Sequence, residues 1–280
     1  LWENMDITYA MLDKVERQDD RNFKAALDVI RYYEKDRLPK CLGWLNKRYG
    51  ITPPENSILL AATNKTVSKT NQWYLKNNTN HKQVYKSMQT GVIDKKEIPV
   101  RDSFTACVGL RVLTINNDRP DQGERWKNGS AGVITALYSS GVQVLFDNGS
   151  DEFVDYNTWE NKERYVAKDV VQADGSLKDE MREEKLGEFS ALPLIIGHAV
   201  TFSRMQGATI KSPMVIDAED ESLYTSPYLG DFGTNMVYVG LSRSSSLDLI
   251  YLKRKLTIDH IKPCGYSLAF WDFCKEASVI

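Results

Sequence analysis

The stretch from Ala199 to Asp217, AVTFSRMQGATIKSPMVID, places polar and charged side chains between apolar runs. A buried strand that only had to turn would need two or three turn residues. Thr201 can cap a short helix over 202–206, and Gly207 can end that helix in a left-handed conformation. Hydroxyls and backbone N–H groups at a helix start suit an anion, although a capped surface helix has the same pattern.

Arg243 is the second candidate for chemistry, in the stretch VYVGLSRSSSLDLIYL. It falls at the end of a helical pattern and just before an apolar strand, where a guanidinium has little structural reason to be unless a nearby Asp or Glu pairs with it. A planar guanidinium suits phosphate, and one that reaches a γ-phosphate from a neighbouring domain stabilises charge in phosphoryl transfer. The position therefore favours a phosphate contact.

A run of basic residues separates two of the predicted elements. Between Ser57 and Ile93 there are five lysines and no acid, although the chain carries a formal charge of −2. The lysines are Lys65, Lys69, Lys76, Lys82 and Lys86. Such a run is either a solvated helix face or a patch that meets phosphates.

The elements that must position these residues alternate between helix and strand. The apolar spacing predicts one amphipathic helix from Asp19 to about Lys35, after two capping-type aspartates, and Pro39 suits the first turn of a second helix from Leu38 to Tyr49. A short strand, Ile58 to Ala62, breaks at Thr63 into another helix. Strands that alternate with helices indicate a parallel α/β sheet, whose ligands bind beyond the carboxyl ends of the strands.

The middle of the chain has a different texture, with short β-type runs from Phe104 to Tyr156. Val142, Val144 and Phe146 recur with a period of two, after a plausible hairpin turn at 139–141. We expect a small antiparallel barrel here, followed by a charged connector, DGSLKDEMREEKLGE, over 174–188.

Composition sets limits on the class of protein. The chain has 280 residues and 42% hydrophobic content, which is ordinary for a soluble globular protein of one or two domains. Its four cysteines form no C-x-x-C pair, which disfavours zinc and fits reduced thiols in the cytoplasm. No apolar run reaches the length of a membrane span. The chain begins with Leu1, so we expect a piece of a longer protein.

Six segments together resemble a known family. AVTFSRMQGAT followed by VYVGLSR looks like motifs V and VI of superfamily 1B helicases, the RecD, Dda and petite-integration-frequency group. MLDKVERQDDRNF resembles motif IV, with Arg17 in the arginine slot, and ILLAATNKTVSKTN resembles the next DNA-contacting motif. VGLRVLTINND and the segment WKNGSAGVITAL resemble the region where a RecA-like domain gives way to an inserted SH3-like barrel.

The resemblance implies a fold, a ligand set and a role for each motif residue. The fold would be a second RecA-like domain over 1–131 and 175–252, with an SH3-like barrel inserted at 132–174 and a C-terminal tail, 253–280, packed on the body. Arg17 and Arg243 would contact the γ-phosphate of ATP, and Gln206 with Gly207 would link nucleotide to DNA. The backbone of single-stranded DNA would be held by Thr63, Asn64, Lys65, Thr201, Ser203 and Arg204.

The family pattern is also incomplete in this chain. Ser203, Arg204 and Met205 replace the histidine, lysine and small residue of motif V, and Thr209 stands where some relatives have a glutamate. No G-x-x-x-x-G-K-S/T loop occurs, so the first RecA-like domain, which would bind most of the ATP and Mg²⁺, is expected to be missing and the fragment alone to be inactive. The implied parent is a cytoplasmic or nucleoid-associated DNA helicase with 5′ to 3′ polarity and no membrane partner. A superfamily 1 RNA helicase and a standalone nucleic-acid-binding or scaffolding module are the alternatives.

Overall fold

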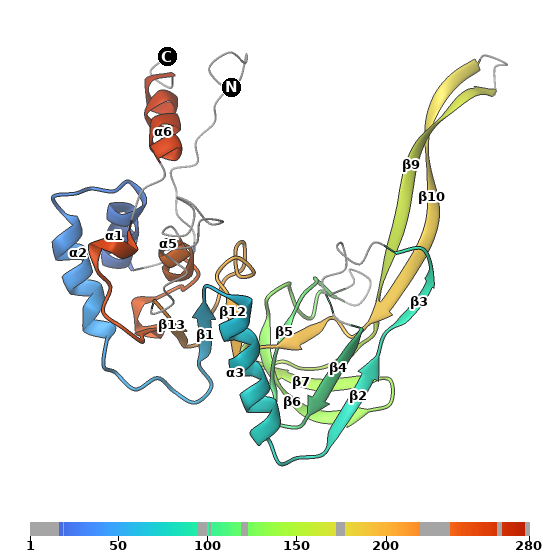
Figure 1. Ribbon diagram of the computed structural model, residues 1–280, viewed down its shortest axis with the longest axis horizontal. Helices are drawn as coiled ribbons and strands as arrows, with labels where there is room; N and C mark the ends of the chain where they lie inside the picture. The colour runs from blue at the N-terminus through green and yellow to red at the C-terminus, as the bar shows by residue number, and fades with distance from the viewer. Residues whose placement is uncertain are drawn as a thin grey trace. The chain divides into compact units, whose positions relative to one another are not determined.

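The chain folds into two compact units in the computed structural model (Figure 1). The residues described are 17–18, 20–93, 100, 102–118, 123–171, 177–218, 236–261 and 265–277. Unit 1 comprises Leu1–Tyr74 and Gly197–Ile280, and unit 2 comprises Leu75–Ile196. Asp19, the first of the two predicted capping aspartates, lies outside the described residues, as do Cys264 and the acidic residues Glu219 to Glu221.

Unit 1 is built on a four-stranded parallel sheet with the strand order β12-β1-β13-β14. The strands are β1 (Ile58–Ala61), β12 (Ala199–Thr201), β13 (Met214–Ile216) and β14 (Ile250–Leu252). Strands buried on both faces need near-continuous apolar sequence, and the sheet's ILLA, AVT, MVI and IYL segments meet that need. The predicted parallel α/β sheet is therefore confirmed.

Two helices precede the sheet in sequence, α1 (Arg21–Arg31) and α2 (Leu38–Leu45), and a short 3-10 helix, η2 (Asn46–Arg48), continues the second. The Asp20 carboxylate caps α1 by accepting hydrogen bonds from the backbone N–H groups of Asn22 and Phe23. Pro39 occupies the first turn of α2, where its missing N–H costs nothing. The first helix was expected from its apolar spacing and the second from Pro39. Both are confirmed, although the α-helical part of the second ends at Leu45 rather than at Tyr49.

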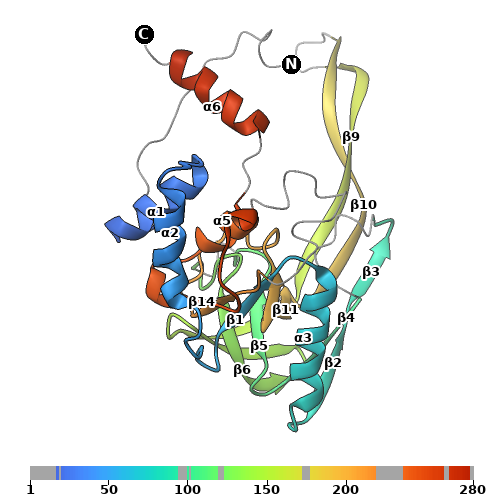
Figure 2. The same cartoon turned by 60° about the vertical axis from the view of Figure 1, so that its left-hand side comes forward.

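The helix α3 (Asn64–Asn77) follows β1 directly, as predicted. The Thr63 hydroxyl accepts a hydrogen bond from the N–H of Thr66 and so caps its first turn. The Asn71 amide donates to the Ala199 carbonyl at 2.9 Å and accepts from the Ala199 N–H at 2.8 Å, which joins α3 to the edge strand β12. Figure 2 shows the chain passing from β1 into α3.

The remaining helices of unit 1 lie towards the C-terminus of the chain. They are α5 (Met236–Leu241), the 3-10 helices η5 (Leu247–Leu249) and η6 (Ile258–His260), and α6 (Gly265–Ala277). Gly240 of α5 approaches Phe202 so closely that a Cβ there would come within 2.5 Å of the ring. In α6 the Trp271 ring stacks on Tyr32, with centroids 4.6 Å apart. No helix among the described residues is both long and apolar enough to cross a membrane.

Unit 2 is made of antiparallel strands arranged in three sheets. A five-stranded sheet has the order β11-β5-β6-β7-β8, a two-stranded sheet pairs β2 with β4, and a three-stranded sheet has the order β3-β10-β9. The strands are β2 (Lys82–Lys86), β3 (Met88–Gly91), β4 (Ser103–Cys107), β5 (Arg111–Thr114), β6 (Ala131–Tyr138), β7 (Gly141–Phe146), β8 (Asp151–Asp155), β9 (Asn157–Val171), β10 (Leu177–Ala191) and β11 (Leu194–Ile196).

The core of unit 2 lies on one face of the five-stranded sheet. Val142, Val144 and Phe146 of β7 are all buried, so the period-two pattern predicted the inward face correctly. The predicted hairpin is also present, since β6 pairs with β7 as far as Tyr138 opposite Gly141. Among the described strands, the edge strands β8 and β11 do not pair with each other, so backbone hydrogen bonds do not close this sheet into a barrel. The predicted SH3-like closure stays a prediction.

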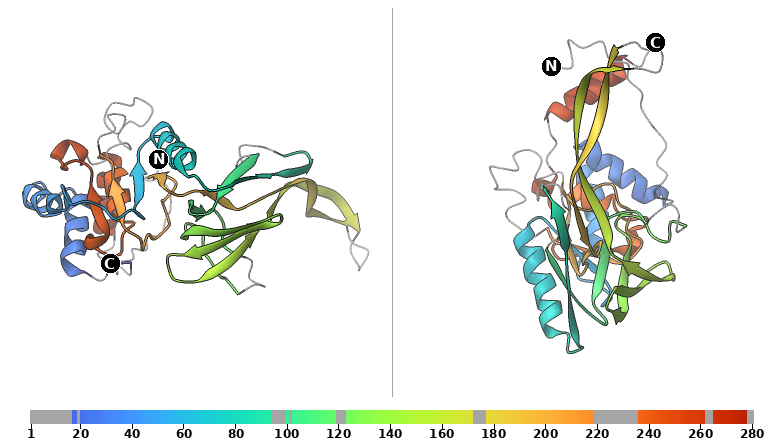
Figure 3. Two further views of the ribbon diagram at one scale, coloured as in Figure 1. Left: turned by 90° about the horizontal axis from the view of Figure 1, so that it is seen from below. Right: turned by 90° about the vertical axis from the view of Figure 1, so that its right-hand side faces the viewer.

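The prediction of a charged connector over 174–188 is wrong, because 177–188 belongs to the 15-residue strand β10. β10 pairs with β9 to form a long antiparallel ribbon that both views of Figure 3 show clearly. Arg164 lies opposite Glu183, with Nε 2.7 Å from Oε1, and Lys185 Nζ is 2.9 Å from Glu160 Oε1. The charges that suggested a solvated connector are cross-strand partners on an exposed ribbon, where each pair contributes little stability.

Candidate functional site

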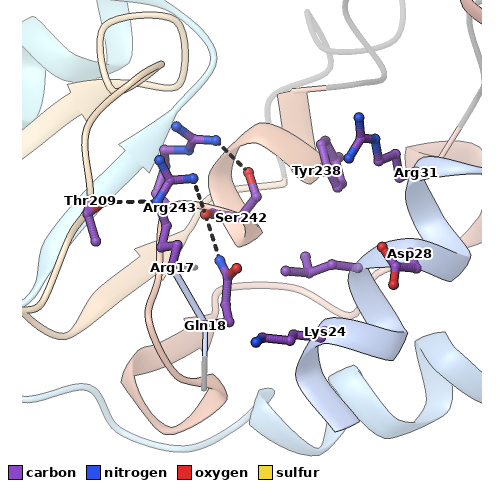
Figure 4. Close-up of a pocket in the computed structure, with 10 residues that line it drawn as sticks. Arg17, Gln18, Lys24, Asp28, Arg31, Thr209, Tyr238, Ser242 and Arg243 are labelled. Atoms are coloured by element: carbon purple, nitrogen blue, oxygen red, sulfur yellow. Dashed lines mark hydrogen bonds between the residues drawn. The ribbon is translucent and has the colours of Figure 1, made fainter. Parts of the chain in front are cut away.

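The loop that follows α5, residues 242–246, is the point where distant parts of unit 1 meet (Figure 4). Gln18 lies 224 residues earlier in the chain and is 2% exposed. Its Nε2 donates to the carbonyl of Ser242 at 3.0 Å and to that of Ser244 at 2.9 Å. The neighbouring Arg17 donates from Nη1 to the same Ser242 carbonyl at 3.1 Å, so Arg17 and this loop are held together.

Arg243 belongs to the same loop, which lies between the helix α5 and the strand β14, as predicted from the sequence. Its Nε donates to the Val239 carbonyl at 3.0 Å and its Nη2 to the Ser242 hydroxyl at 2.8 Å, with a longer contact from Nη1 to the Ala208 carbonyl at 3.4 Å. All three of these hydrogen-bond partners are uncharged groups. The alternative that Arg243 is held by an Asp or Glu therefore finds no support among the described residues.

Two positive charges converge at this loop. Burial lowers the pKa of Arg243, and the charge of Arg17 lowers it further. Arg17 itself donates from Nε to the Thr209 hydroxyl at 2.9 Å, again an uncharged partner. Two guanidiniums held together and bonded to neutral groups repel each other, and an anion placed against both would remove that repulsion.

The arginines open on a pocket of about 510 Å³ within unit 1. Lys24, Asp28 and Arg31 line it from one face of α1, at spacings of four and three residues, and Tyr238 lines it from α5. With Arg17 and Arg243 the lining has four cations and one carboxylate. Burial raises the pKa of the Tyr238 hydroxyl, and the charge of Arg31 opposes that rise. The lining fits an anionic group such as a nucleotide phosphate.

The stretch 201–209 connects this pocket with the carboxyl edge of the sheet. The Thr201 hydroxyl accepts from the N–H of Arg204 at 3.2 Å, and Gly207 has φ of +91°, so both predicted ends of the short segment are confirmed. The short helix predicted over 202–206 is wrong, because the intervening residues form consecutive turns rather than a regular helix. Beyond them the N–H of Ile210 donates to the Arg243 carbonyl at 2.9 Å.

The predicted DNA-contacting residues divide between two adjacent strand ends. Thr63, Asn64 and Lys65 follow β1, and Thr201, Ser203 and Arg204 end or follow β12. β1 and β12 are parallel neighbours with Ala61 opposite Thr201, and the Phe202 N–H donates to the Ala61 carbonyl. The structure therefore brings the two groups to one edge of the sheet, as the strand-end rule predicts.

Individual residues of the predicted set differ in their surroundings. Asn64, Lys65, Ser203 and Arg204 are exposed, and so are Gln206 and Gly207. Met205, which replaces a small residue of the family pattern, is 2% exposed and belongs to the core. The first residue of the acidic cluster at 217–221 has a structural partner, because the buried Asp217 accepts from Lys253 Nζ at 3.1 Å.

Three groups of the site were not picked out as candidates from the sequence. Gln18 is adjacent to Arg17 in the motif but looked like an ordinary polar residue until its burial was known. Thr209 was noted only as a departure from the family, yet it holds Arg17. Lys24, Asp28 and Arg31 are spaced so that they lie on one face of α1. That spacing predicts the shared face but not the pocket that the face lines.

Comparisons with known proteins bear on the fold. No known protein family matches the sequence, and no curated protein matches it. Among solved structures, Pif1 helicase of Bacteroides sp. in complex with ADP-AlF4 matches with a TM-score of 0.75 and 24% identity, over 95% of this chain and 56% of that chain. Pif1 helicase from Bacteroides in complex with ADP-AlF3 and ssDNA matches with a TM-score of 0.65 and 22% identity, over 95% and 56%. Pif1 helicase from Candida albicans matches with a TM-score of 0.63 and 18% identity, over 93% and 59%.

These matches show that the chain has the fold of the corresponding part of Pif1 helicases. The resemblance to the petite-integration-frequency group of superfamily 1B, drawn from four short motifs, is thereby confirmed at the level of fold. The chain spans less than two thirds of the length of each of these helicases.

Proposed function

We propose that this chain is the C-terminal motor half of an ATP-dependent DNA helicase. The observation that carries the proposal is the pair of guanidiniums, Arg17 and Arg243, held at one loop with neutral partners and facing a cationic pocket. Structural neighbours include Pif1 helicases in complex with ADP-AlF4 and with single-stranded DNA. The proposal draws on that likeness of fold and on the chemistry of the pocket together.

In this function Arg17 and Arg243 are two arginine fingers that approach the γ-phosphate of a nucleotide. Bound ATP with Mg²⁺ would supply the phosphoryl group that is transferred to water. A first RecA-like domain of the same parent chain would make most of the contacts to the ATP and Mg²⁺. The two guanidiniums stabilise the negative charge that spreads over the phosphoryl oxygens. Thr209 and the Ser242 carbonyl orient Arg17, while the Val239 carbonyl and the Ser242 hydroxyl orient Arg243.

Coupling to nucleic acid runs through residues 201–209. Gln206 and Gly207 stand between the Thr201 end, on the DNA side, and Ala208, whose carbonyl accepts from Arg243. Thr63, Asn64, Lys65, Thr201, Ser203 and Arg204 bind the sugar-phosphate backbone of single-stranded DNA. Lys65 and Arg204 contribute charge, and the hydroxyls and amide donate to phosphate oxygens. A shift of the arginines as the nucleotide site closes and opens would move this segment and change the grip on the strand.

The finer features of the proposal come from the family resemblance. They are 5′ to 3′ translocation, an SH3-like barrel inserted in a RecA-like body, and the tail 253–280 packed on that body. They also include a cytoplasmic or nucleoid-associated location. The isolated 280-residue chain is expected to hydrolyse no ATP without the rest of the parent protein. The boundaries expected from the sequence differ from the compact units, because the antiparallel unit 2 spans Leu75–Ile196 rather than 132–174.

Replacing one finger tests the function. In the complete protein Arg243→Ala is expected to lower ATP turnover by roughly 10³-fold, because transition-state charge loses a preorganised partner. Single-stranded DNA binding should persist, since Arg243 lies at the pocket end of the connecting stretch. The matched control is Arg37→Ala, which removes an exposed arginine paired with Glu34 and should leave turnover unchanged.

The outcomes discriminate among the candidate functions. Normal turnover with lost DNA binding in Arg243→Ala would contradict the assigned role. A complete protein that binds single-stranded DNA but never hydrolyses ATP would instead be a standalone nucleic-acid-binding module. Unwinding of RNA duplexes in preference to DNA duplexes would assign the chain to the RNA helicases of the superfamily.

A further inference from the structure

The helix α3 has a fixed inner side and an exposed outer side. On the inner side Asn71 holds both backbone groups of Ala199, and the Tyr74 ring stacks on His198 with centroids 3.8 Å apart and planes only 2° from parallel. His198 and Ala199 lead into β12. These two contacts fix the rotation of α3 relative to the sheet of unit 1.

On the outer side three residues recur at four-residue spacing, Lys65, Lys69 and Trp73, and we call this set the Trp73 face. The two lysines are exposed, and the Trp73 side chain is 60% exposed. An indole is one of the side chains that gain most from burial, so an exposed one among cations suggests a ligand with an aromatic surface. Its ring meets Tyr74 edge to face, with centroids 5.0 Å apart, so Trp73 rests on a residue that is itself stacked.

We propose that the Trp73 face is a further subsite for single-stranded DNA, in which a base stacks on the Trp73 indole while Lys65 and Lys69 neutralise the adjacent phosphates. The proposal rests on the DNA-binding function proposed above and extends the strand's path from Thr63 along α3. It adds a base-stacking contact to a set of residues that otherwise meets only the sugar-phosphate backbone.

Charge and length both favour this occupant. The sequence from Ser57 to Ile93 contains no acid, so no carboxylate of this segment repels a phosphate. Lys65 and Trp73 are eight residues apart, or about 12 Å along the helix axis. At about 3.4 Å per stacked nucleotide this length accommodates roughly three nucleotides. Stacking on an aromatic side chain is independent of base identity, which suits a protein that moves along any sequence.

The test is equilibrium binding of a fluorescent oligothymidylate to the 280-residue chain at several salt concentrations. Trp73→Ala is expected to weaken binding by roughly 10-fold and to leave the dependence of log affinity on log salt unchanged, because no charge is lost. Trp73→Phe should retain most of the affinity. Lys65→Gln and Lys69→Gln should each reduce the magnitude of the salt slope by about 0.7.

Two comparisons separate stacking from other effects. An oligomer of abasic deoxyribose phosphate should bind wild type and Trp73→Ala equally, since it offers no base. Tyr49→Ala is the matched control, because Tyr49 is 44% exposed, has Lys255 over its ring, and pairs with Leu252 at the opposite edge of the same sheet. This variant should bind as wild type does.

The results distinguish failure of the subsite from failure of the function. Wild-type binding with no loss in Trp73→Ala, or an equal loss on the abasic oligomer, would overturn the stacking subsite and leave the proposed function intact. Absence of binding by wild type would count against the DNA-binding function itself. Alanine is a better helix former than tryptophan, so the variant should fold, and circular dichroism checks this directly.

Discussion

Gln18 offers the sharpest test of how unit 1 is held together. Gln18→Met keeps nearly the same length and removes both N–H donors, so the change isolates hydrogen bonding from packing. The Ser242 carbonyl keeps its donor from Arg17, whereas the Ser244 carbonyl loses the side chain that donates to it. One ordinary hydrogen bond and one buried acceptor deprived of its donor together cost about 2–4 kcal/mol.

The free energy of unfolding must be measured for each unit separately, because two compact units need not unfold together. Amide hydrogen exchange with peptide resolution provides this measurement. Gln18→Met should destabilise the sheet β12-β1-β13-β14 and leave unit 2 unchanged. Gln83→Met is the control, since Gln83 donates one exposed hydrogen bond to the Tyr138 carbonyl and should cost no more than about 0.5 kcal/mol.

The same substitution should affect catalysis in the complete protein, if Arg17 and Arg243 are the proposed fingers. Both arginines bond to Ser242, so a loop released from Gln18 would misplace both of them, and turnover should fall by roughly 10- to 100-fold. An unfolding free energy within about 0.5 kcal/mol of wild type would refute the energetic reasoning. A destabilised protein with normal turnover would show that Gln18 supports the fold without positioning the arginines.

Two further predictions concern groups remote from the site. Burial lowers the pKa of His260 below its ordinary value of 6.5. Near that pH the unfolded chain therefore binds more protons than the folded chain. The contribution of neutral His260 to the free energy of unfolding is complete above about pH 6.5 and declines as the pH falls. Chemical denaturation between pH 5 and 7 should show this decline, and His260→Gln should flatten it. Asp118, almost fully buried, binds Arg125 through both carboxylate oxygens, and Asp118→Ala should destabilise unit 2 by about 3–5 kcal/mol in urea, whereas Asp151→Ala at an exposed position should change it little.

Local patterns in the sequence were sufficient for much of the fold. The apolar spacing of α1, the proline of α2, the strand-to-helix break at Thr63 and the alternation in β7 each depend on neighbours within a few residues. Thr201 and Gly207 were likewise predicted from cap chemistry, and they make the expected hydrogen bond and positive φ at the ends of a run of turns where a helix was expected. The motif order placed Arg17 and Arg243 as candidates for one site, although nothing in their spacing gives a distance.

The β9 and β10 ribbon shows where such reasoning fails. An exposed two-stranded ribbon buries little on either face, so its sequence carries no period-two apolar signal, and its charges resemble those of a connector. Only the pairing of Glu183 with Arg164 reveals their role, and that pairing joins residues 19 apart.

The local elements and the basic run of α3 can be read from short stretches of sequence, because they follow from propensity, capping and charge among near neighbours. The motif residues can be read from such stretches too, by their resemblance to a family pattern. Other features become visible only in the folded chain: Gln18 is buried against the carbonyls of Ser242 and Ser244, Thr209 holds Arg17, and Trp73 faces outward while Tyr74 stacks on His198. Each of these facts depends on a contact between segments more than 100 residues apart or on the rotation of a helix about its axis. Such contacts are fixed by the packing of the whole unit, and no short stretch of sequence specifies them.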